Sequence, residues 1–513
     1  PGGPRSEDTQ HAINNDIKKG TLLVNYTGHG SILGWAQERI LEIEQIKSWD
    51  NINKLPLFMT ATCKFSYFDD PENKSAGEYL LMNDRGGAIA LLSTTRLVFS
   101  NANFNLNSNF TDIVFNKING ENPRLGDIYK QTKRLSGTGA NNRNFTLLGD
   151  PALHLNYPEY QIRTTSINDT LKALSQVTIE GVIKNNGTIM DQFNGTIFPI
   201  VYDKEISRNT LTDDDCPESI AYLEQNNVLY KGAATVSNGN FAFSFIVPKD
   251  ITYSYAPGKI SYYAVSDDNQ PIDANGSEEN FIIGGTAEDI NYDYDGPEIA
   301  LYMNDRSFVD GGMTNQDPVL IADIYDLSGI NTVGNGIGHD ITAVIDGNFA
   351  NPYILNDFYE SNKDEYSRGT INFPLYDLDI GEHTLTLKLW DVFNNSSEAT
   401  INFLVTDKAN ILVTDYLCFP NPFSSSTEFY FWHNKTPQKM NVSIEIYSIT
   451  GNLVNTINQN YSMPAYRVGP IIWNGEDIYG YRMRAGMYIA KLIVNTEDGD
   501  AITKSTRVIL LPN

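Results

Sequence analysis

The chain has 513 residues, with 37 Lys and Arg against 63 Asp and Glu, which gives a formal net charge of −26. At about 150 residues per domain, this length predicts three or four domains. The negative charge argues against binding to a phosphate backbone, so nucleic acid is not expected as a partner. Only 19% of the residues are charged while 41% are hydrophobic, a balance typical of a chain that is folded nearly throughout.

Cysteine usage and the start of the chain exclude several further classes. The three cysteines, Cys63, Cys216 and Cys418, lie far apart and form no CxxC pair. This spacing supports neither a structural zinc site nor a disulfide framework. No stretch approaches the ~18 apolar residues of a membrane span. The first ten residues, PGGPRSEDTQ, are polar and loop-like without a signal-peptide core, so the chain is expected to continue from a preceding segment of a longer precursor.

Residues 1–158 have the pattern of an α/β domain. Three short apolar runs, Thr21–Tyr26, Leu55–Thr62 and Gly87–Thr94, are continuous rather than alternating, which predicts strands covered on both faces. The segments between them carry apolar residues at helical spacing. Strand, helix and strand in alternation predict a parallel sheet with right-handed crossovers.

The remaining chain has the pattern of β domains. Alternating stretches such as QVTIEGVIKNNG and HTLTLKLWDVFN are separated by turn dipeptides, which is typical of β-sandwiches. We predict a β-sandwich module in 159–285, an immunoglobulin-like β module in 286–408 and a C-terminal β-sandwich in 409–513.

Two residues at predicted strand ends suggest a catalytic site. His29 follows the first apolar run in NYTGHGS, and Cys63 follows the second in TATCKF. The carboxyl ends of parallel strands meet at one edge of a sheet, so both side chains are expected there. A thiol activated by an imidazole is a nucleophile for acyl transfer. A turn histidine and a buried core cysteine are the structural alternatives.

These segments resemble a known family. NYTGHGS, FMTATCKFSYFDDP, SAGEYLLMNDRGGAIALLSTTR and FTLLGDPALHL together are similar to the gingipain family of cysteine peptidases, in the caspase-like clan. The resemblance implies a caspase-like parallel sheet that is incomplete at its N-terminus. It makes Cys63 the nucleophile and His29 the general acid/base, with the backbone N–H groups of Gly30 and Cys63 as the oxyanion hole. The family's acidic partner of the histidine lies upstream of the HG motif and is not assigned here.

The C-terminal region carries a second resemblance. CFPNPFSSSTEFYF, IEIYSITGNLV, WNGEDIYG and MRAGMYIAKL are similar to the C-terminal sorting domain of type IX secretion cargo. With the gingipain-like region, they resemble the sortase of that system. This implies a peptidase at the surface of a Gram-negative bacterium, bound peripherally to the outer membrane through a PorV-type barrel. It would remove the sorting domain of cargo proteins through a Cys63 thioester, and an amine of lipopolysaccharide or water would resolve the thioester.

Two alternative hypotheses of function remain open at this point. The chain could be a gingipain-like secreted endopeptidase that is itself cargo, or a surface adhesin whose caspase-like domain is inactive. The peptidase chemistry requires no cofactor. The acidic stretches Asp293–Gly296 and Thr212–Cys216 could bind calcium, but neither completes a calcium loop, which favours solvated turns.

The run Thr21–Tyr26 carries a further expectation. A strand that is apolar along its length is normally found inside a sheet rather than at an exposed edge. We therefore expect a preceding segment of the same precursor to pair beside it and to supply the acidic partner of His29.

Overall fold

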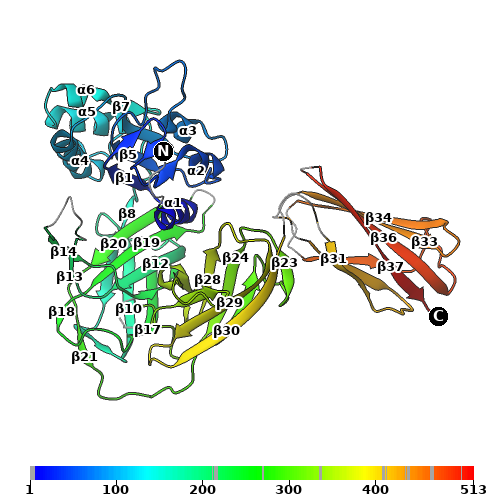
Figure 1. Cartoon of the computed structure of the whole chain (residues 1–513). Coiled ribbons are helices and arrows are strands. Elements are labelled where there is room, and N and C mark those ends of the chain that lie inside the picture. The colour runs from blue at the N-terminus through cyan, green and yellow to red at the C-terminus, as the bar shows by residue number, and fades with distance from the viewer. Residues whose placement is uncertain are drawn as a thin grey trace. The chain divides into compact units, whose positions relative to one another are not determined.

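The computed structural model describes all residues except 1–5, 211, 213–217, 269–270, 334–337, 407–410, 412, 434, 436–438, 463–466, 498 and 513. The chain divides into two compact units, Pro1–Tyr157 and Pro158–Asn513, and the first contains the helices labelled in Figure 1. The second unit is built of strands, so the protein is β-rich and multidomain. No helix in the described part of the chain is long and apolar enough to cross a membrane.

The first unit is built on a four-stranded sheet in the order β1-β5-β6-β7. Its strands are β1 (Leu23–Thr27), β5 (Leu57–Ala61), β6 (Ala90–Thr94) and β7 (Phe145–Leu148). Strands β1, β5 and β6 run parallel, and β7 is antiparallel to β6. The three predicted apolar runs therefore form the predicted parallel strands.

Helices cover both faces of this sheet. They are α1 (Glu7–Lys19), α2 (Ile43–Ser48), α3 (Ala76–Met82), α4 (Ser100–Val114), α5 (Leu125–Leu135) and α6 (Ala140–Asn144). Phe58 and Met59 are neighbours on β5 and therefore point to opposite faces. Phe58 packs in the apolar cluster of α1, α2 and α3, whereas Met59 packs in the cluster of α4 and α5. The unit is thus a three-layer sandwich of helices, sheet and helices.

Helix α1 corrects the expectation of a loop at the start of the chain. The helix begins at Glu7, and its apolar residues Ile13 and Ile17 pack against the sheet. Two apolar residues four positions apart give only one turn of helical pattern. Tertiary packing rather than propensity therefore stabilises this helix, which explains why its sequence signal is weak.

Strand β1 lies at an edge of the described sheet, with β5 as its hydrogen-bonded neighbour. Leu23 packs against the α4 side and Val24 against the α1 side, so both faces are covered. The covering is partial, because Asn25 and Thr27 are exposed. A further segment paired beside β1 stays a prediction.

A small antiparallel sheet follows β1. It consists of β2 (Gly30–Ser31), β3 (Gly34–Trp35) and β4 (Leu41–Glu42). Trp35 is 2% exposed and anchors this sheet in the core beneath α1, α2 and α3.

The second unit begins with a nine-stranded sheet and shorter companion sheets. The strands are β8 (Tyr160–Ser166), β9 (Thr170–Ala173), β10 (Gln176–Asn185), β11 (Thr188–Ile189), β12 (Gly195–Tyr202), β13 (Ile206–Asn209), β14 (Ala221–Glu224), β15 (Val228–Lys231), β16 (Ala234–Ser237), β17 (Asn240–Ile246), β18 (Ala256–Pro257), β19 (Lys259–Ser266), β20 (Asp273–Glu278) and β21 (Ile282–Thr286). The alternate residues Phe241, Phe243 and Phe245 of β17 are buried in its core, as the alternating pattern predicts.

Two further sheets face each other across one core. Their orders are β22-β24-β28-β27 and β23-β30-β29-β25-β26. The elements are β22 (Glu298–Met303), β23 (Gly312–Thr314), β24 (Val319–Tyr325), β25 (Thr342–Ile345), β26 (Tyr353–Ile354), η1 (Asn356–Phe358), β27 (Tyr359–Asn362), β28 (Glu365–Pro374), β29 (Gly381–Trp390) and β30 (Ser396–Val405). The immunoglobulin-like character of this module stays a prediction.

The C-terminal strands form a smaller sandwich. They are β31 (Val413–Phe419), β32 (Thr427–His433), β33 (Met440–Ser448), β34 (Leu453–Tyr461), β35 (Arg467–Trp473), β36 (Gly486–Thr496) and β37 (Ala501–Leu510). The sheet orders are β31-β32-β35 and β34-β33-β36-β37, and both sheets contribute to one apolar core.

Trp473 is the centre of that core. It is 2% exposed, its ring lies 5.4 Å from that of Tyr488 and 5.5 Å from that of Phe423, and its indole N–H donates to the carbonyl of Glu476. We expect Trp473→Ala to lower the free energy of unfolding of this domain by ~3 to 5 kcal/mol, because truncation leaves a cavity. Chemical denaturation measures this loss. Tyr479→Ala is the control, since Tyr479 is 77% exposed, and an equal loss in both variants would contradict the role of Trp473.

Candidate active site

The loops that carry His29 and Cys63 lie side by side at the carboxyl edge of the sheet. In the parallel pair β1 and β5, Thr27 is opposite Ala61, so His29 and Cys63 each follow two residues beyond the last paired position. The amide of Gly28 donates to the carbonyl of Ala61 at 3.4 Å. The structure therefore brings the two predicted loops into contact, and the fold of β1 and β5 decides this placement.

Gly30 is required for this close approach. A Cβ atom on Gly30 would lie 2.2 Å from the Oγ1 atom of Thr62, the residue before Cys63. A side chain at position 30 would require the Thr62 side chain to move. The absence of a side chain thus leaves room for Thr62 where the histidine loop meets the cysteine loop.

The backbone of His29 is held while its side chain is exposed. The His29 carbonyl accepts hydrogen bonds from the Tyr26 hydroxyl at 2.8 Å and from the Ala36 amide at 2.8 Å. An exposed imidazole on a fixed backbone can exchange protons with a bound substrate.

Cys63 carries a free, half-buried thiol. Its Sγ atom lies 3.6 Å from the carbonyl oxygen of Val98, in the loop that follows β6. The amide N–H of Cys63 donates to no acceptor among the residues that the structure describes. A free amide beside a thiol is available to bind a developing oxyanion.

Gly30 supplies a second candidate donor. In the hairpin of β2 and β3, Gly30 pairs with Trp35, and the neighbouring pair is joined by the bond from Ala36 to the carbonyl of His29. Hydrogen-bonded and non-hydrogen-bonded pairs alternate along an antiparallel ladder, so the N–H of Gly30 points away from β3. The geometry is compatible with the predicted oxyanion hole, whose residues stay a prediction.

Two asparagines of α4 donate hydrogen bonds to residues of β1 and β5. This role was not predicted from the sequence. Asn103 is buried and donates to the carbonyl of Ala61 at 3.2 Å. One turn later, Asn107 donates to Asn25 at 2.9 Å and to the hydroxyl of Thr27 at 2.8 Å. Asparagine is unfavourable in the interior of a helix. Two asparagines four residues apart on one helix face were therefore the available signal for contacts outside the helix.

Two exposed apolar side chains lie near Cys63. Leu97 and Phe99 flank Val98 and are 62% and 75% exposed. The nearby carboxylate of Asp69 is paired with the guanidinium of Arg96 at 2.9 Å, and this hydrogen bond lowers the pKa of Asp69. Substrate side chains that lie against this surface would contact hydrocarbon rather than a free carboxylate.

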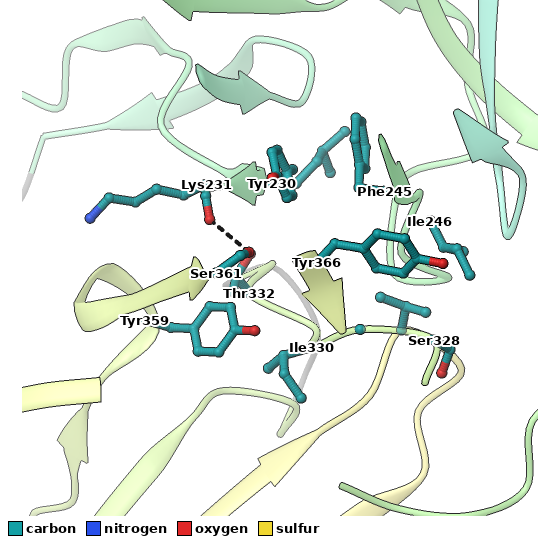
Figure 2. Close-up of a pocket in the computed structure, with 13 residues that line it drawn as sticks. Tyr230, Lys231, Phe245, Ile246, Ser328, Ile330, Thr332, Tyr359, Ser361 and Tyr366 are labelled. Atoms are coloured by element: carbon teal, nitrogen blue, oxygen red, sulfur yellow. Dashed lines mark hydrogen bonds between the residues drawn. The ribbon is translucent and has the colours of Figure 1, made fainter. Parts of the chain in front are cut away.

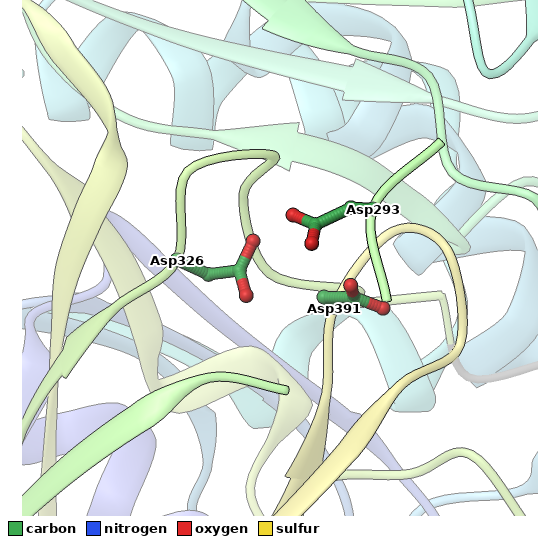
Figure 3. Close-up of side chains that lie close together, drawn as sticks. All are labelled: Asp293, Asp326 and Asp391. Atoms are coloured by element: carbon green, nitrogen blue, oxygen red, sulfur yellow. The ribbon is translucent and has the colours of Figure 1, made fainter. Parts of the chain in front are cut away.

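Three carboxylates of the second unit could hold a metal ion. Ligand oxygens of Asp293, Asp326 and Asp391 lie within 4.8 Å of one another, and Figure 3 shows the three side chains converging from separate loops. Carboxylate oxygens are the ligands that calcium prefers. The calcium expectation included Asp293 but not the other two residues, which are distant in sequence. Most of the other acidic stretch, Thr212–Cys216, lies outside the described residues.

We expect these carboxylates to make the stability of the second unit depend on pH. Burial, with the charges of Asp326 and Asp293 adding to it, raises the pKa of Asp391 to about 6, and burial also raises the pKa of Asp326. The unfolded carboxyl titrates near pH ~4. Between these values the folded state binds more protons, so the free energy of unfolding falls as the pH rises from ~4 to ~6. With a chelator present, we expect the thermal midpoint of this unit to be higher at pH 5 than at pH 7.

Asp391→Asn provides the control for this prediction. The variant lacks the carboxyl group whose pKa burial raises to about 6, so its midpoint should depend less on pH across the same window. An unchanged slope would contradict the assignment to Asp391.

A cavity of the second unit is too small to be a substrate site. Its volume is about 20 Å³, and Figure 2 shows that Tyr230, Ile330 and Tyr359 line it, with the Ser361 hydroxyl donating to the carbonyl of Lys231 at 3.0 Å. This volume holds about one water molecule. Residues of the first two β modules of the unit line this cavity. A peptide or an organic cofactor would not fit into it.

Comparisons with known proteins agree with a peptidase assignment for the first unit. Residues 1–156 match the family model described as Peptidase family C25, the gingipain family of cysteine peptidases. No curated protein matches the chain.

Two solved structures from Porphyromonas gingivalis are similar to this chain. Dimeric latent PorU is 30% identical, with alignment over 84% of this chain and 41% of that one and a TM-score of 0.32. The complex of RgpB pro- and mature domains is 17% identical, with coverage of 54% and 57% and a TM-score of 0.27. The chain thus spans less than half of the length of the PorU chain.

Proposed function

We propose that this protein is a PorU-like sortase, a caspase-like cysteine peptidase that removes the C-terminal sorting domain from type IX secretion cargo. The match of residues 1–156 to peptidase family C25 supports a cysteine peptidase. The observation that carries the chemistry is the contact between the His29 and Cys63 loops, through the bond from Gly28 to the carbonyl of Ala61.

In the proposed reaction, His29 takes the proton of the Cys63 thiol. The thiolate attacks the peptide carbonyl that precedes the sorting domain, and the N–H groups of Gly30 and Cys63 bind the oxyanion. His29 then gives the proton to the leaving amine, so the sorting domain departs and a thioester remains on Cys63. An amine of lipopolysaccharide attacks this thioester and frees the thiol, whereas attack by water would release the cargo as an acid.

The proposal includes partners and a location. Cargo proteins with sorting domains are the substrates, and a PorV-type barrel holds the enzyme peripherally at the outer membrane of a Gram-negative cell. The C-terminal sandwich of 409–513 serves docking rather than chemistry. A preceding segment of the same precursor pairs beside β1 and supplies the acidic partner of His29.

Mass spectrometry tests this function directly. The protein is incubated with a cargo that carries its sorting domain, with and without an amine acceptor, and the new carboxyl end of the cargo is identified. Cleavage before the sorting domain and addition of the amine are expected. Cleavage at many other sites would favour a secreted endopeptidase, and the absence of cleavage together with an unreactive Cys63 would favour an adhesin.

A further inference from the structure

The backbone of His29 is fixed by a side chain from the preceding strand. The Tyr26 hydroxyl donates to the His29 carbonyl at 2.8 Å, and the Ala36 amide donates to the same oxygen at 2.8 Å. Two donors from different directions fix the orientation of this peptide group. The Cα atom of His29 belongs to that group, so the origin of the imidazole side chain is fixed with it.

Tyr26 is itself fixed by an aromatic cluster. Its ring stacks on the ring of Trp35, with centroids 4.3 Å apart and planes at 12°. Trp35 is buried and packs against Phe58 at 5.9 Å and Phe65 at 5.6 Å. Phe58 lies on β5, and Phe65 follows Cys63 by two residues. One cluster therefore supports the histidine loop and the cysteine loop together.

Gly28 leaves space for the Tyr26 hydroxyl to reach the His29 carbonyl. A Cβ atom at position 28 would lie 2.5 Å from the Tyr26 hydroxyl oxygen, closer than non-bonded atoms approach. The glycine before the histidine is therefore required by the contact with Tyr26.

The phenol stays a donor under the conditions of the reaction. Partial burial and the charge of Glu38 both raise the pKa of Tyr26 above its ordinary value. The hydroxyl is therefore protonated at neutral pH. Tyr26 interacts with the carboxylate of Glu38, the ring of Trp35 and the carbonyl of His29.

We propose that Tyr26 is a positioning residue that holds His29 in place for proton transfer with Cys63. This inference rests on the proposed function, because it requires His29 and Cys63 to act as a pair. Tyr26 does not touch the reacting atoms. It acts through the backbone of His29, and its hydroxyl rather than its ring supplies the effect.

The test compares variants by the rate at which iodoacetamide alkylates Cys63 between pH 5 and pH 9. Peptide mass spectrometry reads Cys63 separately from the other cysteines of the full chain. Tyr26→Phe keeps the ring that stacks on Trp35 and removes the hydroxyl. We expect about a threefold to tenfold lower alkylation rate at pH 7, a factor of the size that one ordinary hydrogen bond provides. We also expect the profile to move to higher pH, toward that of His29→Ala.

Tyr157→Phe is the matched control. The Tyr157 hydroxyl also donates to a backbone carbonyl, that of Val114 at 2.5 Å, but it belongs to the α4 side of the unit. This variant makes the same chemical change and should keep the wild-type profile. If the alkylation profile shifted equally in both variants, Tyr26 would only stabilise the fold of the unit. That result would overturn the proposal.

The outcomes separate this inference from the proposed function. If His29→Ala leaves the alkylation profile unchanged, the Cys63 and His29 pair is wrong and the positioning role falls with it. If His29→Ala changes the profile and Tyr26→Phe does not, only the positioning role is overturned. Should Tyr26→Phe fail to fold, Gly28→Ala displaces the phenol instead, and a wild-type profile in that variant would contradict the proposal.

Discussion

We expect Cys63→Ala to abolish cargo processing, a loss of roughly a thousandfold or more, because the variant has no nucleophile. The fold should persist, since the thiol is half-buried and the change removes one sulfur atom from the edge of the core. A cleavage assay on cargo, together with thermal unfolding, measures both properties. His29→Ala should be nearly as severe, because the thiol then lacks its proton acceptor.

Cys418→Ala is the matched control for this experiment. Cys418 is also a free and half-buried cysteine, but it lies on β31 in the C-terminal sandwich. This variant should process cargo at the wild-type rate. If Cys63→Ala or His29→Ala did so as well, the mechanism proposed above would be wrong.

The second large effect concerns the C-terminal sandwich. We expect deletion of residues 407–513 to release the protein from the cell surface, because we assign docking to this part of the chain. Deletion from Asp415 onward would cut through β31, which begins at Val413, so the earlier boundary is preferable. Cell fractionation measures the release.

The deletion should leave the peptidase active on a soluble substrate. In the described chain, strands β31–β37 pair only with one another, and the first unit has apolar clusters of its own. Trp473→Ala in the full chain is a milder companion variant that destabilises the same domain. Surface attachment that persists after deletion would contradict the docking role, and loss of activity on the soluble substrate would show that the sandwich supports the catalytic unit.

The local pattern of the sequence was sufficient for the three parallel strands of the first unit. The apolar runs that become β1, β5 and β6 are continuous because helices cover both faces of the sheet, and this burial is visible in composition alone. The same logic predicted that His29 and Cys63 leave the sheet at one edge, and the register of Thr27 with Ala61 gives the two loops equal distances from their strands.

Weak local signals explain what the sequence did not reveal. Helix α1 carries only the apolar pair Ile13 and Ile17 on its packed side, so its helical periodicity is short. Asn103 and Asn107 occur in a helix where asparagine is unfavourable by propensity. Their value lies in the strands to which they donate, and the partners Ala61 and Asn25 are 42 and 82 residues away in the chain.

The sequence by itself determined the classes of the two units and the edge of the sheet at which His29 and Cys63 lie, whereas their catalytic roles stay a prediction. Periodicity and strand order are sufficient for these, because they depend on burial averaged over short segments. Only the tertiary structure decided that the Tyr26 hydroxyl holds the His29 carbonyl and that Asp293, Asp326 and Asp391 converge. Both depend on contacts of individual atoms. The three aspartates lie on loops that are distant in sequence, so no local pattern predicts that they meet. Such contacts arise only when the packing of the whole unit fixes the backbone to within the length of a hydrogen bond.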